Sequence, residues 1–165
     1  MFLFILSGIA VFFYGLWYFG KDLPDYKELS KYNPNVVTRI HAGNGALLAE
    51  YAIQKRVFVP VNVIPKKVIN AFISAEDKDF YHHFGIDLVA TFRALITNVK
   101  NIGTGKRLIG ASTITQQVAK NFLLSSEVSY ERKIKEAILA IRIERAFSKN
   151  EILELYLNEI YLGFK

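Results

Sequence analysis

Helical periodicity dominates the sequence from Ile64 to the last residue. Apolar side chains recur every three or four positions in five successive segments, which is the spacing of amphipathic helices. Four of these segments begin at a residue suited to start a helix: Pro65, Asp87, Ser129 and Ser148. Ser148 is followed three positions later by Glu151, the spacing of a capping box. The sequence therefore predicts a mainly α-helical chain without internal repeats.

The phase of each pattern predicts which face of a helix is buried. In the helix after Asp87, the expected buried side chains are Leu88, Val89, Phe92, Leu95, Ile96 and Val99. In the helix after Ser129, they are Ile134, Ala137, Ile138, Ile141 and Ile143, with Glu136 on the polar side. A further helix is expected over residues 111–124, ended by a pair of serines.

The first twenty residues contain no charged side chain and end in a group of aromatic residues. Their length matches the hydrocarbon thickness of a bilayer, so residues 1–20 are predicted to form a transmembrane anchor. A cleaved signal peptide is the alternative, but no basic start or small-residue cleavage site is present. The polar stretch over residues 21–35 holds two prolines and is predicted to be a linker.

Residues 36–60 change in character, with β-branched and apolar runs on either side of an Asn44-Gly45 turn. This pattern predicts a β-hairpin and leaves open a third short strand. His41 lies beside the turn and is given no role. The resulting division is an anchor over 1–20, a linker with a short β segment over 21–62, and a helical domain over 63–165.

The composition narrows the kinds of partner. The net charge of +6 suits an anionic partner such as a membrane surface or a phosphate. The basic residues are scattered and form no nucleic-acid-binding motif, which argues against nucleic acid as a partner.

The glycine-rich basic interval over 100–110 is predicted to be a mobile loop. It lacks the spacing of a nucleotide-binding loop, so an ATPase is excluded. The sequence contains no cysteine, which excludes disulfides and thiolate chemistry.

The residues from Ser74 to Leu124 carry the most specific chemistry. Glu76 and Asp77 follow an apolar helical run, where an acid is expected to lie half-buried at the edge of a cleft and desolvation raises the pKa of a carboxyl group. A general base working near neutral pH needs such an environment. Residues 110–121 then bring small, hydroxyl and amide side chains to one helix, which suits a sugar or phosphate ligand. The alternative is that the acids cap a helix and the polar run is an exposed helix face.

Four segments resemble the motifs of the peptidoglycan glycosyltransferases, glycosyltransferase family 51. They are E-D-K-D-F-Y-H-H-F-G over 76–85, G-A-S-T-I-T-Q-Q-V-A-K-N over 110–121, R-K-I-K-E over 132–136 and K-N-E-I-L-E-L-Y-L-N over 149–158. The preceding anchor and β segment make the chain most similar to the N-terminal part of a class A penicillin-binding protein. In such proteins a transpeptidase domain follows.

The resemblance implies a lysozyme-like, mainly α-helical glycosyltransferase domain on the outer side of the cytoplasmic membrane. It implies polymerisation of lipid II into glycan strands by inverting transfer. Glu76 would be the general base that takes the proton of the acceptor 4-hydroxyl, and undecaprenyl pyrophosphate would be the leaving group. Lipid II, the growing glycan, membrane lipid and cell-wall synthesis proteins are the implied partners.

The resemblance also implies roles for other residues. Lys120, Arg132 and Lys133 would bind the pyrophosphate, with Mg²⁺ or a similar divalent cation as cofactor, and Glu136 would orient these cations or help hold the metal. Asp77 and His83 would support Glu76, while the remaining expected substrate contacts are Ser112, Thr113, Gln116, Gln117 and Asn121. Asn158 in the fourth motif is left open between a structural and a binding role.

Two departures from the family pattern stand out. Val128 occupies a position where many members carry an arginine, so one phosphate contact is expected to be missing. The fifth motif does not occur, so we expect the chain to be incomplete as an enzyme. Two other functions stay open: a lysozyme-like hydrolase or lytic enzyme that cuts glycan, and a non-catalytic scaffold of the cell-wall machinery.

Overall fold

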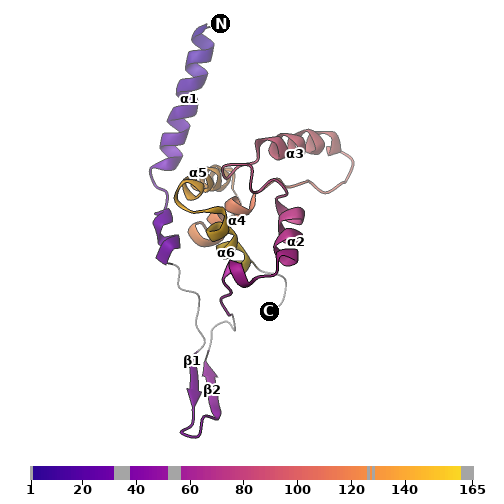
Figure 1. The fold of residues 1–165 in the computed structure, drawn as a ribbon. Coiled ribbons are helices and arrows are strands. Elements are labelled where there is room, and N and C mark those ends of the chain that lie inside the picture. Colours follow the sequence, from indigo (N-terminus) through magenta and orange to yellow (C-terminus); the bar gives the residue numbers. More distant parts are fainter. Residues whose placement is uncertain (1, 32–37, 52–56, 126, 128, 161–165) are drawn as a thin grey trace.

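The computed structural model describes residues 2–31, 38–51, 57–125, 127 and 129–160. Within these ranges, six α-helices, two short 3₁₀ helices and two strands follow one another along the chain (Figure 1). The elements are α1 (Phe2–Gly20), η1 (Tyr26–Lys31), β1 (Thr38–His41), β2 (Leu47–Tyr51), η2 (Val61–Val63), α2 (Lys66–Glu76), α3 (Leu88–Asn101), α4 (Ile114–Leu123), α5 (Tyr130–Ala146) and α6 (Lys149–Glu159). The prediction of a mainly helical chain is confirmed.

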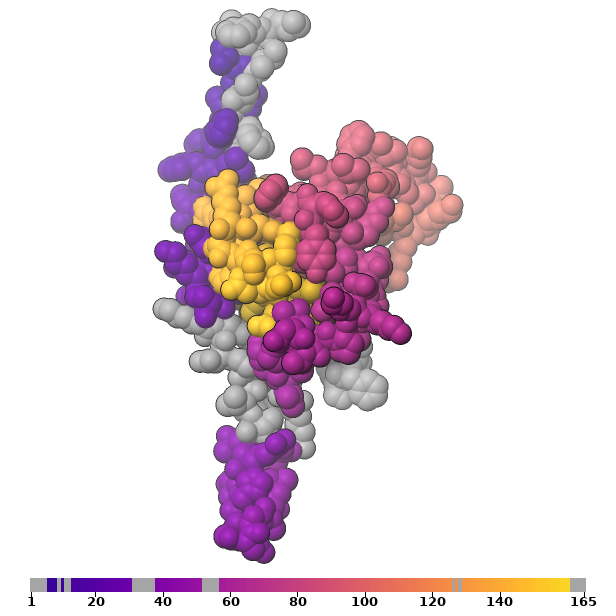
Figure 2. Space-filling model, in the orientation of Figure 1, coloured from indigo at the N-terminus to yellow at the C-terminus, as the bar shows by residue number. Residues whose placement is uncertain are grey.

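The hydrophobic core lies where α4, α5 and α6 pack against one another (Figure 1). Its fully buried side chains are Phe80, Ile114, Val118, Leu139, Ile143, Ile152, Leu153 and Tyr156. Figure 2 shows α6 in the middle of the visible face, with α3 projecting to one side and the hairpin below. The core therefore holds the second, third and fourth motifs together.

Three of the four predicted helix starts are confirmed by side-chain hydrogen bonds, whereas Pro65 precedes α2 without one. The Asp87 carboxylate accepts from the Ala90 N–H at 2.7 Å, and the Ser129 hydroxyl accepts from the Arg132 N–H at 3.1 Å. Ser148 and Glu151 form the expected capping box, and hydrogen bonds from the Ser148 backbone and hydroxyl lower the pKa of Glu151. These caps are local contacts, which is why the sequence could predict them.

The helix expected over residues 111–124 begins later than predicted, at Ile114. Thr113 is its N-cap and forms a second capping box with Gln116, so the residues before Thr113 are extended rather than helical. The side chain of Thr113 accepts from the Gln116 N–H, and the side chain of Gln116 accepts from the Thr113 N–H. This cap leaves Ser112 on a non-helical segment in front of the helix.

The predicted buried face of α3 is wrong. Its apolar side chains are exposed, from 41% for Ile96 to 74% for Leu88, and only Ala94 is buried. Of the described elements, none packs closely against α3, which projects away from the core (Figure 1). Periodicity correctly gave an amphipathic helix, but it cannot tell whether another element covers the apolar face.

The predicted phase of α5 is also wrong in part. Ile134 and Ile141 are exposed, whereas the buried residues are Glu136, Leu139, Ala140 and Ile143. These positions still follow helical spacing, but the buried stripe includes an acid that was assigned to the polar side. A charged side chain can be buried when cations neutralise it, and two cations do so here, as described below.

The N-terminal segment is helical as predicted. Among the described residues, no helix is long and apolar enough to cross a membrane, so the structure does not bear out the transmembrane anchor predicted for residues 1–20. The end of α1 contacts α5, where the Arg142 guanidinium donates to the Gly20 carbonyl at 3.1 Å. The predicted linker is partly folded, since Leu29 in η1 is only 4% exposed and packs into the core.

The predicted hairpin is confirmed as an antiparallel pair of β1 and β2. Gly45 in the turn has a positive φ of 83°, and Arg39 pairs with Glu50 across the strands at 2.8 Å. Residues 57–60 are not in a strand, and residues 52–56 lie outside the described residues, as does Val128. The expected loop over 100–110 is held by Asn98, whose side-chain amide exchanges two hydrogen bonds with the Ile109 backbone at 2.8 and 2.9 Å.

Gly85 closes the first motif against α5. Its φ is +86°, and a Cβ at this position would lie 2.7 Å from both the carbonyl carbon and the oxygen of Ala140. We expect Gly85→Ala to lower the free energy of unfolding by about 2–4 kcal/mol, because the side chain meets both backbone strain and a rigid neighbour. Urea denaturation followed by circular dichroism measures this difference.

Two glycines serve as matched controls. Gly103 has a φ of +79° with open space around it, so Gly103→Ala isolates the backbone cost of about 1–2 kcal/mol. Gly43 has neither feature, so Gly43→Ala is expected to change stability by less than about 0.5 kcal/mol. A Gly85 variant no less stable than the Gly103 variant would contradict the close contact with Ala140.

Candidate active site

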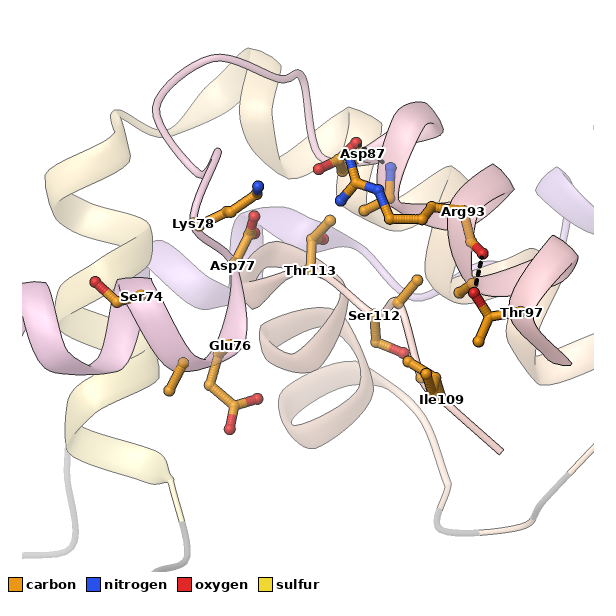
Figure 3. A pocket seen from close by; sticks show the side chains of 15 residues that line it. Ser74, Glu76, Asp77, Lys78, Asp87, Arg93, Thr97, Ile109, Ser112 and Thr113 are labelled. Atoms are coloured by element: carbon orange, nitrogen blue, oxygen red, sulfur yellow. Dashed lines mark hydrogen bonds between the residues drawn. The ribbon is translucent and has the colours of Figure 1, made fainter. Parts of the chain in front are cut away.

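A pocket of about 260 Å³ lies between the end of α2, the first half of α3 and the segment before α4 (Figure 3). Its polar lining comes from the end of α2, the first two motifs, and α3 with its N-cap. The polar and charged side chains are Ser74, Glu76, Asp77, Lys78, Asp87, Arg93, Thr97, Ser112 and Thr113. The first and second motifs, distant in sequence, therefore form one concave surface.

Glu76 is the last residue of α2 and is exposed at this pocket, so the expected half-burial is wrong. The helix ends at Glu76, and its side chain projects away from that of Asp77 (Figure 3). The Gln117 amide donates to the Glu76 carboxylate at 2.9 Å. Lys120 and Asn121 follow Gln117 by three and four residues on α4, so one face of this helix extends from Glu76 towards a lysine.

Asp77, by contrast, is only 7% exposed and joins the first motif to α4. Its carboxylate contacts Nε2 of His83 at 2.9 and 3.0 Å and accepts from the Ile114 N–H at 3.0 Å. The Ile114 N–H is one of the donors at the start of α4 that have no partner within the helix. Asp77 and His83 thus form a buried pair that joins the first motif to α4, and their expected support of Glu76 stays a prediction.

Thr113 and Gln116 are occupied by structural contacts. Thr113 is 2% exposed, and its hydroxyl donates to the Gly85 carbonyl at 2.6 Å besides capping α4. Gln116 is 8% exposed and completes the capping box. Because these hydrogen bonds occupy both side chains, they do not favour the substrate contacts expected for Thr113 and Gln116, which stay predictions. Gln117, the next residue, contacts Glu76 instead.

Glu136 lies at the centre of a buried charge cluster. It is 1% exposed and receives hydrogen bonds from the Arg132 guanidinium and the Lys133 ammonium. The ammonium also donates to the Ser112 hydroxyl at 2.7 Å, and Ser112 lines the pocket. Two cations surround one carboxylate, so the cluster carries a net positive charge next to the pocket. The structure thus brings Ser112, Lys133 and Glu136 together and gives Glu136 the geometry of an orienting group.

A second network was missed by sequence reasoning. The Lys149 ammonium donates to the His83 carbonyl at 2.7 Å and to Glu144 at 2.8 Å, and it lies 4.4 Å from the centre of the Phe80 ring. Glu144 also accepts from the Thr115 hydroxyl at 2.6 Å. Lys149 opens the fourth motif, but neither its burial nor its partners follow from helical periodicity. The network fixes the loop of the first motif on α4, α5 and α6.

The side chain of Asn158 makes structural contacts. Its side-chain amide accepts from the Val59 N–H at 2.8 Å and donates to the Val59 carbonyl at 2.9 Å, while Glu154 accepts from the Val61 N–H at 2.7 Å. Among the described residues, no three His, Asp or Glu side chains form a group suited to a metal ion. The carboxylates nearest the pocket already have partners, so these residues alone do not fit a protein-held cation.

The comparisons with known proteins agree with the arrangement of these motifs. A family model described as Transglycosylase matches residues 44–165. The chain belongs to the transglycosylase family. The predicted resemblance to the glycosyltransferase domain of class A penicillin-binding proteins is thereby confirmed.

Three relatives illustrate this likeness. The chain is 54% identical over 159 residues to penicillin-binding protein 1A of Rickettsia felis, with 96% of this chain and 20% of the relative covered. It is 49% identical to penicillin-binding protein 1A of Aquifex aeolicus, covering 96% of this chain and 21% of the relative. It is 46% identical to penicillin-binding protein 1A of Escherichia coli, covering 92% of this chain and 18% of the relative. The chain spans about a fifth of the length of these curated relatives.

The buried charge cluster generates a prediction about stability. We expect Glu136→Gln to lower the free energy of unfolding by about 2–4 kcal/mol, because Arg132 and Lys133 then lack the carboxylate that compensates them. Chemical denaturation measures the change. On the same helix, Glu131 is 59% exposed and pairs with Lys135 at 2.6 Å. Glu131→Gln is the control and should cost less than about 0.5 kcal/mol. Equal losses in the two variants would mean that the Glu136 cluster is not buried.

Proposed function

We propose that this domain polymerises lipid II into glycan strands, with Glu76 as the general base. Glu76 takes the proton of the acceptor 4-hydroxyl. The oxygen then attacks the anomeric carbon of the donor on the side opposite the pyrophosphate. The bond from that carbon to the pyrophosphate breaks, and its electron pair leaves with undecaprenyl pyrophosphate. An unprotonated carboxylate is needed at the start of this step, and positive charge is needed where the pyrophosphate departs.

The observation that carries this proposal is an acid on the pocket wall and a cation bonded to another residue of that wall. Glu76 lines the pocket from α2, and Ser112 lines it from the segment before α4 with the Lys133 ammonium 2.7 Å from its hydroxyl. Glu136 orients Lys133 and Arg132 rather than acting on substrate in this proposal. Lys120 and Asn121 extend the same surface along α4 and are proposed to contact donor groups. Gln117 holds the base through its hydrogen bond to the Glu76 carboxylate.

The surroundings of the pocket support a lipid-bound substrate. The exposed apolar face of α3 borders the pocket, since Arg93 and Thr97 line it while Phe92, Leu95 and Val99 are more than half exposed. A large exposed apolar face is typical of membrane or partner contact. The proposed location is the outer side of the cytoplasmic membrane. It rests on family membership and on this face, not on a membrane-spanning helix.

Two other functions remain to be separated by experiment. A glycan-cleaving hydrolase also uses a carboxylate in a helical cleft, but it has no need of a cationic cluster for a departing pyrophosphate. Incubation with labelled lipid II distinguishes them: chain growth supports the transferase, and shortening of preformed glycan supports the hydrolase. Absence of both reactions would favour the non-catalytic scaffold.

The role of Glu76 leads to a third prediction. Glu76→Gln is expected to lower the rate of lipid II polymerisation by about 10²–10⁴-fold, because the amide cannot accept the proton. Gel separation of labelled glycan products measures the rate. The melting temperature should not change, since Glu76 is exposed. Glu28→Gln, an exposed acid on η1, is the matched control and should keep full activity. Equal rates for the Glu76 variant and the wild type would remove Glu76 as the base.

A further inference from the structure

The hydroxyl of Tyr156 has no role in the contacts described so far. The side chain is 1% exposed, and within the described part of the chain its hydroxyl has no hydrogen-bond partner. A buried hydroxyl without a partner is costly and uncommon in folded proteins, so each case calls for an explanation. Phenylalanine would fill the same space in the core without this cost.

The ring of Tyr156 packs against α2, the helix that ends at Glu76. Tyr156 on α6 packs edge to face on Phe72 of α2, with ring centroids 6.2 Å apart and planes at 80°. Phe72 and Glu76 are four residues apart on α2, so they share one face of that helix. The ring of Tyr156 therefore contacts the turn of α2 that precedes the proposed base.

Electrostatics supports the same neighbourhood. Burial raises the pKa of the Tyr156 hydroxyl far above its usual range, and the negative charge of Glu76 adds to this shift. A tyrosine hydroxyl is protonated at neutral pH even at its ordinary pKa, so it is available as a hydrogen-bond donor. Gln117 donates to Oε2 of Glu76, and no described side chain donates to Oε1. Tyr156 is thus a donor without a partner whose ring packs one helical turn before Glu76, and one oxygen of the Glu76 carboxylate has no side-chain donor among the described residues.

We propose that Tyr156 is a positioning residue for Glu76: its hydroxyl donates a hydrogen bond to the Glu76 carboxylate when the exposed glutamate side chain turns towards it. This inference rests on the proposed function for the meaning of Glu76 as the base. Together with Gln117, the hydroxyl fixes the carboxylate from two sides, and a bond to the ionised form favours that form. Contacts of this kind are often long in unliganded structures and shorten when substrate binds.

Tyr156→Phe tests the proposal because it removes one oxygen atom and keeps the ring. We expect kcat for lipid II polymerisation to fall about tenfold with KM unchanged, since the base is less well held. The acid limb of the pH–rate profile should move up by about one unit, because the ionised carboxylate has lost a donor and takes up its proton at higher pH. The melting temperature should stay within about 3 °C of the wild type.

The other charged groups around Glu76 are the same in the wild type and in Tyr156→Phe. They are Asp77, Lys78, Asp87 and Arg93 on the pocket wall and Lys133 behind Ser112. A shift of the acid limb of the pH–rate profile in Tyr156→Phe is therefore due to the loss of the hydroxyl. Tyr26→Phe, at a half-buried tyrosine packed against the core from η1, is the control and should leave the profile unchanged.

The outcomes separate the inference from the proposed function. An unmoved acid limb, with or without a loss of stability, would overturn the positioning role of Tyr156. If the wild-type chain does not elongate lipid II, the proposed function fails. In that case, a carbon-13 NMR titration of the Glu76 carboxyl group tests the Tyr156–Glu76 hydrogen bond. The signal of Glu76 is identified by its absence in Glu76→Gln. A titration midpoint that rises in Tyr156→Phe supports the hydrogen bond, and an unchanged midpoint overturns it.

Discussion

The site depends on the buried carboxylate of Asp77. It accepts hydrogen bonds from the start of α4 and contacts His83 of its own motif, so it joins two segments that are 37 residues apart. A carboxylate loses its hydration on burial, and here protein donors replace that hydration. Because Asp77 is fixed in this way, the preceding residue must leave the core. Glu76 therefore reaches the pocket, and the two neighbouring acids occupy opposite environments.

Two further networks of hydrogen bonds and ion pairs stabilise the walls of the pocket. Lys149 and Glu144 bind the carbonyl of His83 and the hydroxyl of Thr115, so the loop after Asp77 is attached to three helices. On the other side of the pocket, Glu136 holds Arg132 and Lys133. Each network buries a carboxylate, with side-chain exposures of 1% for Glu136 and 4% for Glu144, and its interactions are stronger there than at an exposed surface. The result is a concave surface with fixed charges on a rigid helical support, which suits a site that must stabilise developing charge.

Local signals in the sequence predicted much of the helical framework. The caps at Asp87, Ser129 and Ser148 depend on residues within one turn, so the sequence contains all that determines them. The face of α3 could not be predicted, because a periodic pattern does not say which element covers it. The burial of Glu136 depends on the position of Arg132 and Lys133 relative to the core, and the partners of Lys149 come from distant segments. The motifs identified the site residues only through their resemblance to a family. The capping contacts of Thr113 and Gln116 were not predicted, although Thr-x-x-Gln has the spacing of a capping box.

The close approach at Gly85 has a mechanical consequence. With no side chain between them, the backbone of the first motif rests directly on the backbone of α5 at Ala140. Ala140 lies one helical turn beyond Glu136, and close-packed interiors transmit small displacements with little loss. A side chain at position 85 would force the two backbones apart. The distance between the first motif and the helix that carries the charge cluster is therefore set by direct main-chain contact.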